Sequence, residues 1–195
     1  MLKTETVGAE TVYMFPWQPN FSDGVDVSFT FRTVISKNKR HNEQRRGLVN
    51  VPFREIGASF QICELEAETF LNDIRSVFHQ FLFAPVYIEP LTASSTITDE
   101  RLFTNEDTSE YFHLRNFTEY CLGLDYSSKA YEVNKIDTFV GNNRIDFVGA
   151  WSEAFITETS VFYPCFFAFL NAKPSGTSKN SEILEVKLNF KEEKI

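Results

Sequence analysis

The chain has 195 residues and a net charge of −8, and 15% of its residues are aromatic, mostly Phe. This length supports one domain whose core needs no disulfide or metal to hold it together. The low counts of Gly (8) and Pro (7) exclude collagen-like and low-complexity chains, and the aromatic content favours β-structure.

Aromatic and proline residues gather in residues 13–20, ahead of the first predicted strand. Two interpretations are open for Phe15 and Trp17. Either they fill one end of a β-sandwich, or the segment docks on a neighbouring subunit. Pro16 and Pro19 favour an extended polyproline II conformation, which would lower the entropy cost of docking.

Apolar and polar residues alternate over residues 25–32 and again over residues 55–62. A period of two indicates strands with one buried face. A basic segment, residues 36–46, lies between them in a chain that is otherwise acidic. The pattern predicts a β-hairpin with a long basic arm. The cations of the arm and of the residues that follow it are Lys37, Lys39, Arg40, Arg45, Arg46 and Arg54.

The basic arm has three interpretations: a solvated loop, a nucleic-acid contact or a protein contact. Nucleic-acid binding often adds aromatic stacking to positive charge, but no aromatic residue lies between Phe31 and Phe53. A protein contact fits better, because an acidic body with a basic arm is complementary to a second copy of itself. Head-to-tail contacts of this kind close into rings or extend into stacks. We therefore expect no nucleic-acid partner.

After the strand predicted at residues 55–62, the spacing between apolar residues changes from two to three or four. This spacing predicts an amphipathic α-helix over about residues 64–83, with Asp73 on its polar face and Pro85 at its end. Acidic residues at the start suit the positive end of the helix dipole. His79, near the end of the helix, is predicted to be solvated or stabilised by the helix dipole.

The rest of the chain predicts further strands. Residues 86–89 are expected to form a short strand, and residues 92–135, with no sustained period, are predicted to be strands and loops that form a possible insertion. A β-branched and aromatic run covers residues 157–169, turn residues cover 172–178, and a final strand covers 184–191. The predicted fold is a β-sandwich or split barrel with one helix packed on it.

Motifs of catalysis are missing from the sequence: it has no Gly-rich phosphate loop, no GxSxG and no HExxH. The histidines lie in different contexts, and the acidic pairs, including Glu192-Glu193, are predicted to be solvated. We therefore expect no catalytic, cofactor or metal site.

The sequence also indicates the compartment. No apolar leader is visible, and the longest apolar stretch, residues 161–170, is too short to span a bilayer. We expect a soluble protein made in a cytoplasm, with no membrane partner. Cys63, Cys121 and Cys165 lack metal-ligand spacing and are predicted to be buried free thiols.

The order of these motifs resembles that of bacteriophage tail structural proteins of the distal-tail or tail-hub type. The resemblance covers about residues 13–90 and 155–191. It begins with Phe-Pro-Trp-Gln-Pro-Asn at 15–20 and continues with Glu-Gln-Arg-Arg at 43–46 inside the basic arm. The return strand, the helix, a Pro-containing exit and two late strands follow, one of them containing Tyr-Pro. One departure is that residues 50–54 hold a single arginine, where the family pattern has a basic pair and a proline.

The resemblance implies a non-enzymatic component of the virion, assembled in the host cytoplasm. It would form a ring of identical copies that joins the tail tube, hub and fibres. The inter-subunit contact residues would be the six cations named above, with Phe15 and Trp17. Arg45 and Arg46 are expected to contribute most, because guanidinium groups pair bidentately with carboxylates.

Two other functions remain open. The chain could be a carbohydrate- or receptor-binding module of a virion. The aromatic residues that would serve it in the middle third are Tyr111, Phe112, Tyr120, Tyr126 and Tyr131. A host-directed enzyme or a nucleic-acid binder is the third hypothesis.

Overall fold

The computed structural model describes residues 2–30, 33–37, 43–47, 53–95, 97, 100–170, 175–180 and 183–193. The fold is mainly β with one amphipathic helix packed on the sheet, as the sequence predicts. The helices are α1 (Glu64–Val77) and α2 (Phe112–Phe117), with 3-10 turns η1 (Phe21–Asp23) and η2 (Thr108–Glu110). The strands are β1 (Thr4–Val7), β2 (Glu10–Met14), β3 (Val25–Thr30), β4 (Thr33–Lys37), β5 (Glu43–Gly47), β6 (Phe53–Cys63), β7 (Phe81–Pro85), β8 (Leu91–Thr92), β9 (Arg101–Phe103), β10 (Tyr120–Asp125), β11 (Tyr131–Val140), β12 (Arg144–Phe147), β13 (Ser160–Leu170), β14 (Ser175–Asn180) and β15 (Ile183–Glu192).

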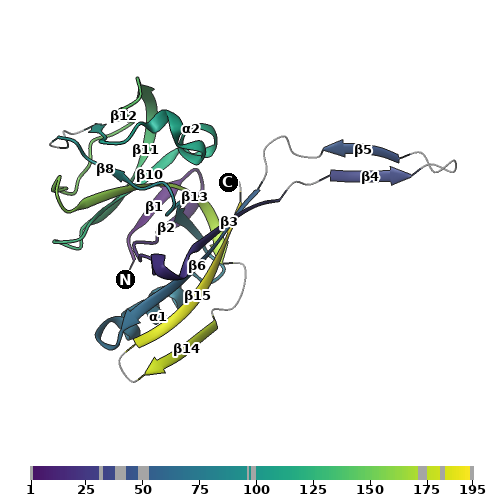
Figure 1. Cartoon of the computed structure of the whole chain (residues 1–195), viewed down its shortest axis with the longest axis horizontal. Helices are drawn as coiled ribbons and strands as arrows, with labels where there is room; N and C mark the ends of the chain where they lie inside the picture. The colour runs from purple at the N-terminus through teal and green to yellow at the C-terminus, as the bar shows by residue number, and fades with distance from the viewer. Residues whose placement is uncertain are drawn as a thin grey trace.

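All of these strands except β4 and β5 belong to one hydrogen-bonded network. On one side, β6 pairs with β3 and β15, and β15 pairs with β14. On the other, β10 pairs with β11, β11 with β12, and β12 with β9. Strand β13 joins the two parts, because it pairs with both β15 and β10. Figure 1 shows the parts as two wings, with α1 beside β6 and β15 and α2 beside β11.

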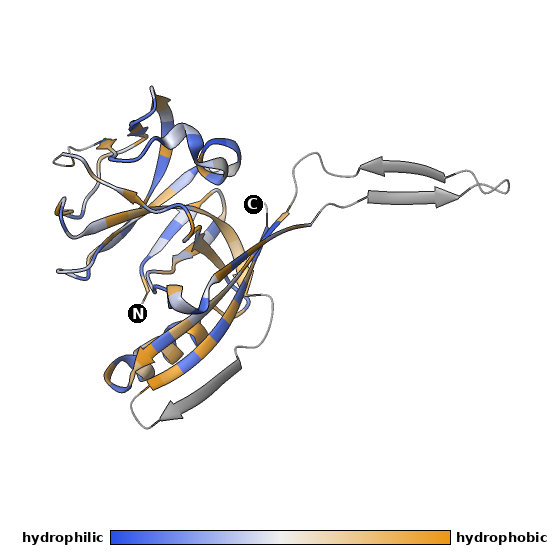
Figure 2. Ribbon diagram, in the orientation of Figure 1, coloured by the Kyte–Doolittle hydropathy of each residue, from blue (hydrophilic) through white to orange (hydrophobic). Residues whose placement is uncertain are grey.

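Alternation along the long strands places their apolar residues in the main core. Figure 2 shows hydrophobic and hydrophilic residues alternating along β6 and β15. The residues of β6 that were predicted to face the core are buried, namely Ile56, Ala58, Phe60 and Ile62. The matching residues of β15 are Val186, Leu188 and Phe190. Helix α1 covers this core with Phe70, Ile74 and Val77.

The predicted helix is wrong at its end, because α1 stops at Val77 and not near residue 83. His79 adopts a φ of 67°, and the chain turns there into β7. Strand β7 pairs with β2 on one side and β13 on the other, so it is almost fully buried. Its unbroken apolar run fits a helix or a central strand equally well. The strand predicted at 86–89 is also wrong, since these residues form a turn.

The middle third contributes a central strand of the sheet. Strand β10 lies between β11 and β13, and all of its residues are buried. A second core cluster lies beneath it, with Leu102, Ile145, Phe147 and Trp151 among its members. The turn predicted at 172–178 is wrong in its second half, because residues 175–178 belong to β14.

Candidate assembly interface

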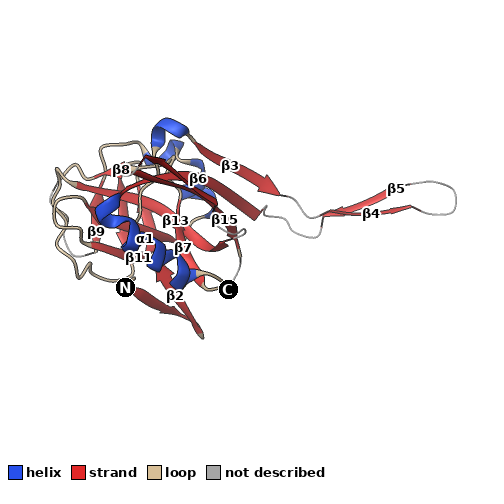
Figure 3. Cartoon of the chain, turned by 90° about the horizontal axis from the view of Figure 1, so that it is seen from below, coloured by secondary structure: helices blue, strands red, loops and turns tan. Residues whose placement is uncertain are grey.

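The basic segment forms a hairpin of its own. Strands β4 and β5 pair antiparallel from Thr33↔Gly47 to Lys37↔Glu43 and make a separate two-stranded sheet. Among the described strands they pair with no other. Figures 1 and 3 view the molecule from two directions, and in both the hairpin extends away from the body. The predicted arm is therefore confirmed as a projecting β-hairpin, which we call the arm.

Of the six cations predicted to make contacts, three lie in the strands of the arm, two lie outside the described residues, and Arg54 lies in the body. Lys37 ends β4, and Arg45 and Arg46 lie in β5, in register with Ile35 and Val34 of β4. Lys39 and Arg40 lie outside the described residues.

Arg54 lies inside the fold at the start of β6, and its side chain is only 1% exposed. Its Nε and Nη2 donate to the two carboxylate oxygens of Glu192 at 3.0 and 2.8 Å, and its Nη1 donates to Thr118 Oγ1 at 3.3 Å. The guanidinium carbon lies 4.4 Å from the centre of the Phe166 ring. Arg54 is therefore a structural residue and not an exposed contact. Glu192 is likewise buried, which corrects its predicted solvation.

Strand β3, which leads into the arm, is fixed to the body at Phe29, the residue opposite Arg54. Phe29 of β3 pairs in register with Arg54, and its ring stacks on His113 with the ring centres 5.4 Å apart. The backbone N–H groups of His113 and Leu114 donate to Glu89 at 2.8 and 2.9 Å. Burial lowers the pKa of His113, although the Glu89 carboxylate opposes this shift. Phe29 and Arg54, with His113 and Glu192, form what we call the arm root.

Phe15 is a core residue and not an interface residue. It is fully buried, and its ring packs edge-on against Phe60 and Phe190, with centre distances of 5.7 and 5.3 Å. Trp17 is half-buried on α1, where it packs at 5.0 Å on Phe70. Of the two interpretations of this segment, the structure supports packing for Phe15.

Trp17 also orients a buried carboxylate that the sequence pattern had placed on the polar face of the helix. Its Nε1 donates to Asp73 Oδ2 at 3.1 Å, and Asp73 is only 7% exposed. A signal existed in the spacing, because Asp73 lies three residues after Phe70, next to Ile74 on the apolar stripe of α1. Trp17 and Asp73 border a cavity of about 410 Å³ between α1 and the turn that joins β10 to β11.

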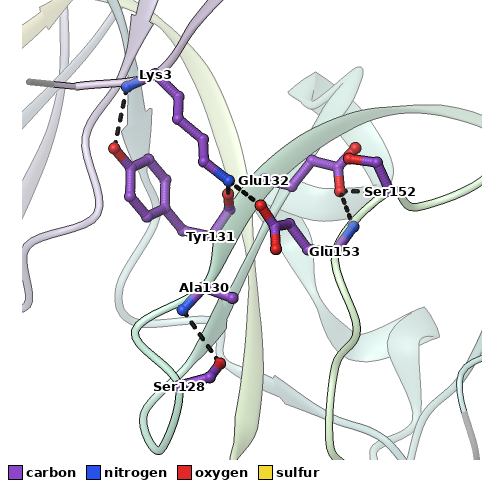
Figure 4. Close-up of polar contacts among 7 residues, drawn as sticks. All are labelled: Lys3, Ser128, Ala130, Tyr131, Glu132, Ser152 and Glu153. Carbon is purple, nitrogen blue, oxygen red and sulfur yellow. Dashed lines mark hydrogen bonds and ion pairs between the residues drawn. The ribbon is translucent and has the colours of Figure 1, made fainter.

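A set of polar contacts beside this cavity ties the start of the chain to β11 (Figure 4). The backbone N–H of Lys3 donates to the Tyr131 hydroxyl at 3.0 Å, and Lys3 Nζ donates to the Tyr131 carbonyl at 2.9 Å and pairs with Glu153. Glu132 accepts from the backbone N–H groups of Ser152 and Glu153 at 2.8 and 2.9 Å. These contacts hold the 152–153 loop and β1 against the same strand.

The aromatic residues considered for carbohydrate binding are not gathered at one place. Tyr126 and Tyr131 both line the cavity beside α1. Tyr111 instead donates to the Pro90 carbonyl at 2.8 Å, and Tyr120 packs at 5.1 Å on Phe83 in another part of the sheet. The side chain of Phe112 lies outside the described residues.

Two of the three cysteines are buried as predicted, and Cys63 is exposed, which corrects its prediction. Burial raises the pKa of Cys121 and of Cys165. Within the residues described, no three His, Cys, Asp or Glu side chains are placed to hold a metal ion. Neither described helix has the length and hydropathy needed to cross a membrane.

Comparison with known proteins adds no identity: no protein-family model matches the chain, and no curated protein matches it either.

Proposed function

We propose that the chain is a non-enzymatic structural component of a bacteriophage tail. In this proposal copies of the chain form a ring, and the arm makes the contact to the next copy or to a neighbouring tail protein of the tube, hub or fibres. The observation that carries the proposal is the arm itself, a two-stranded hairpin that pairs with no other described strand. An isolated two-stranded hairpin is marginally stable in water, so docking on a partner surface would stabilise it.

Charge supports a protein partner of acidic character. Residues 36–46 contain five basic residues and one acidic residue, while the whole chain has a net charge of −8. The remainder of the chain is therefore more acidic than the total. Opposite charge on the two partners speeds their encounter and fixes their register. A second copy of this chain offers such a surface.

The arm root gives a fixed base to β3 and β6, the two strands that lead toward the arm. Phe29 and Arg54 lie opposite each other on the two strands that lead to the arm, and each is held by a residue from a distant part of the chain. A buried bidentate ion pair fixes its partners in one geometry. The arm therefore leaves the body from a rigid base, which lowers the entropy cost of docking.

The proposal is tested by replacing the two arginines of β5. Arg45→Ala/Arg46→Ala should prevent ring formation, because losing one partner of a desolvated charge pair costs about 2–5 kcal/mol. The measurement is size exclusion with light scattering, followed by negative-stain images of the purified protein.

A matched control removes two exposed arginines elsewhere, Arg75→Ala/Arg101→Ala. It should assemble like the natural sequence. Rings that persist in the β5 variant, or a natural chain that stays monomeric at every concentration, would reject the role of the arm.

A further inference from the structure

The cavity beside α1 is formed by four separate stretches of the chain: Leu2, residues 16–18, the end of β6 with α1, and the β10–β11 turn with the strand ends beside it. It lies between residues 16–18, α1 and the β10–β11 turn, and its volume of about 410 Å³ suits a small ligand or one inserted side chain. The lining residues used below are Trp17, Glu66, Asp73, Asp125, Tyr126, Lys129 and Tyr131.

Asp73 presents a carboxylate oxygen that lacks a partner. The side chain is 7% exposed, and its Oδ2 accepts the hydrogen bond from Trp17 Nε1. No residue that the structure describes donates to Oδ1. Since Oδ1 is not among the fully buried side-chain atoms without a partner and Asp73 lines the cavity, this oxygen is open to the cavity and available to a ligand. A charged donor forms the stronger hydrogen bond to a carboxylate, so a cation satisfies it best.

The other charged groups of the cavity are already engaged. Asp125 accepts hydrogen bonds from Ser127 and Ser128, among others. Glu66 and Lys129 pair with each other at 3.3 Å on the exposed side. Of the two buried carboxylates that line this cavity, Asp73 is therefore the one with spare acceptor capacity.

The tyrosines of the cavity have engaged hydroxyls, so what they offer a ligand is their rings. The Tyr131 hydroxyl accepts from the Lys3 N–H, and the Tyr126 hydroxyl bonds to that of Tyr163 at 3.3 Å. Tyr126 is 42% exposed. Aromatic rings next to a buried carboxylate are a favourable setting for an organic cation, because the ring faces carry negative charge density.

We infer that this cavity binds an organic cation of the guanidinium or ammonium class. The cation donates a hydrogen bond to Asp73 Oδ1 and lies against the rings of Trp17 and Tyr126. A neutral polar ligand would satisfy the hydrogen bond but would leave the carboxylate charge uncompensated. The cation is either a free small molecule or a basic side chain of a protein, and the second source includes the arm of another copy, which rests on the proposed function.

The test is calorimetric titration of the full chain with N-acetyl-arginine amide, and with the citrulline analogue as a neutral ligand of the same shape. The arginine compound should bind. The affinity of the citrulline compound should be lower by about tenfold or more, because hydrogen bonds between charged groups are stronger than those to neutral donors. Binding should weaken as salt is raised.

Asp73→Asn removes the charge but keeps an oxygen for Trp17, and it should weaken arginine binding by about tenfold or more. Asp137→Asn, an exposed aspartate in β11 that does not line the cavity, is the matched control and should change nothing. If Asp73→Asn fails to fold, Tyr126→Leu at the exposed rim takes its place, with an expected loss of about threefold or more.

Several results would overturn the inference: no binding of the arginine compound at about 10 mM, equal binding of the citrulline compound, or full binding by Asp73→Asn. Neutral saccharides that bind without salt dependence and survive Asp73→Asn would assign the cavity to carbohydrate instead.

A peptide of residues 36–47 separates the two sources. Binding at least about tenfold tighter than that of the arginine amide identifies the arm of another copy as the occupant, and equal or weaker binding identifies a free cation. Ring formation by Asp73→Asn distinguishes the two proposals. If Asp73→Asn loses cation binding but still forms rings, the role of the arm in assembly stands, and the arm docks at a site other than this cavity.

Discussion

Gly123 lies at a point of β10 where two aromatic rings leave no space for a side chain. A methyl group at this position would lie 2.8 Å from Phe155 Cζ and 2.9 Å from Phe162 Cε1. Both rings belong to the second core cluster, where neighbouring rings hold them in place. The requirement for glycine here comes from close packing and not from a special backbone conformation.

Gly123→Ala should lower the free energy of unfolding by about 1–3 kcal/mol, because overpacking a filled core strains its side chains. Urea denaturation measures the change. Gly149→Ala is the control, since nothing lies within 4 Å of the added methyl group. Equal stability of the two variants would show that the aromatic cluster has room to relax.

At the scale of single elements, the β10–β11 turn is organised around one carboxylate. Asp125 accepts from the backbone N–H groups of Ser127 and Ser128 at 2.9 and 2.8 Å, and from the hydroxyls of Thr159 and Ser160 at 2.8 Å each. The N–H of Ser128 and the hydroxyl of Ser127 are the main causes that hold the pKa of Asp125 well below its usual value of 3.8. The turn thus joins β10 and β11 to the start of β13.

This shift predicts a loss of stability in acid. The folded state favours the ionised form of Asp125, so its contribution is present above the unfolded value of 3.8 and is lost as the pH falls toward the lower pKa of the folded state. Asp125→Asn should be less stable than the natural chain at pH 7 and should lose less stability on further acidification. Denaturant unfolding from pH 7 to pH 3 measures how the free energy of unfolding changes with pH in the natural chain and in the variant, with Asp137→Asn as the control. Parallel slopes for all three proteins would contradict the assignment.

The elements also show where sequence patterns are sufficient. The alternation of β6 and β15 gave both strands and their buried faces, because one face packs on α1 and the other faces outward. The end of α1 was not predictable in this way. Phe81 and Leu82 continue the helical spacing, and only pairing of β7 with β2 and β13 selects the strand.

The alternation of buried and exposed residues along β6 and β15 also indicated that the charged residues of the arm root are buried. Arg54 is in phase with the buried residues Ile56 and Ala58, and Glu192 is in phase with Leu188 and Phe190. Charge alone had placed Arg54 with the arm and Glu192 in solvent. Phase along a strand was the better guide, because a strand that continues into the core buries every second residue whatever its charge. The cavity beside α1 was beyond prediction, since four separate stretches of the chain form it.

At the scale of the whole molecule, β4 and β5 of the arm form a sheet of their own, apart from the sheet of the body. Thr30 and Phe53 are paired in register at the last described rung of the β3–β6 ladder before the arm. Below this rung, the described contacts of Phe29 with His113 and of Arg54 with Glu192 lie within the body, as does the main core cluster.

Replacing residues 31–52 by Asn-Gly should therefore give a folded protein. This dipeptide favours the type I′ turn that closes a two-residue hairpin. The free energy of unfolding should stay within about 1 kcal/mol of that of the full chain, and, under the proposed function, the shortened protein should not form rings. Thermal unfolding and light scattering test the two expectations together. A shortened protein that aggregates or unfolds would show that the body depends on the arm.

The bond between Arg54 and Glu192 spans 138 positions of the chain. Translation therefore releases the basic segment long before the carboxylate that fixes its base has been made. Until β15 pairs with β6, the base of the arm lacks this ion pair. Under the proposed function, nascent chains on one messenger should therefore not join through their arms before β15 has been made and has paired.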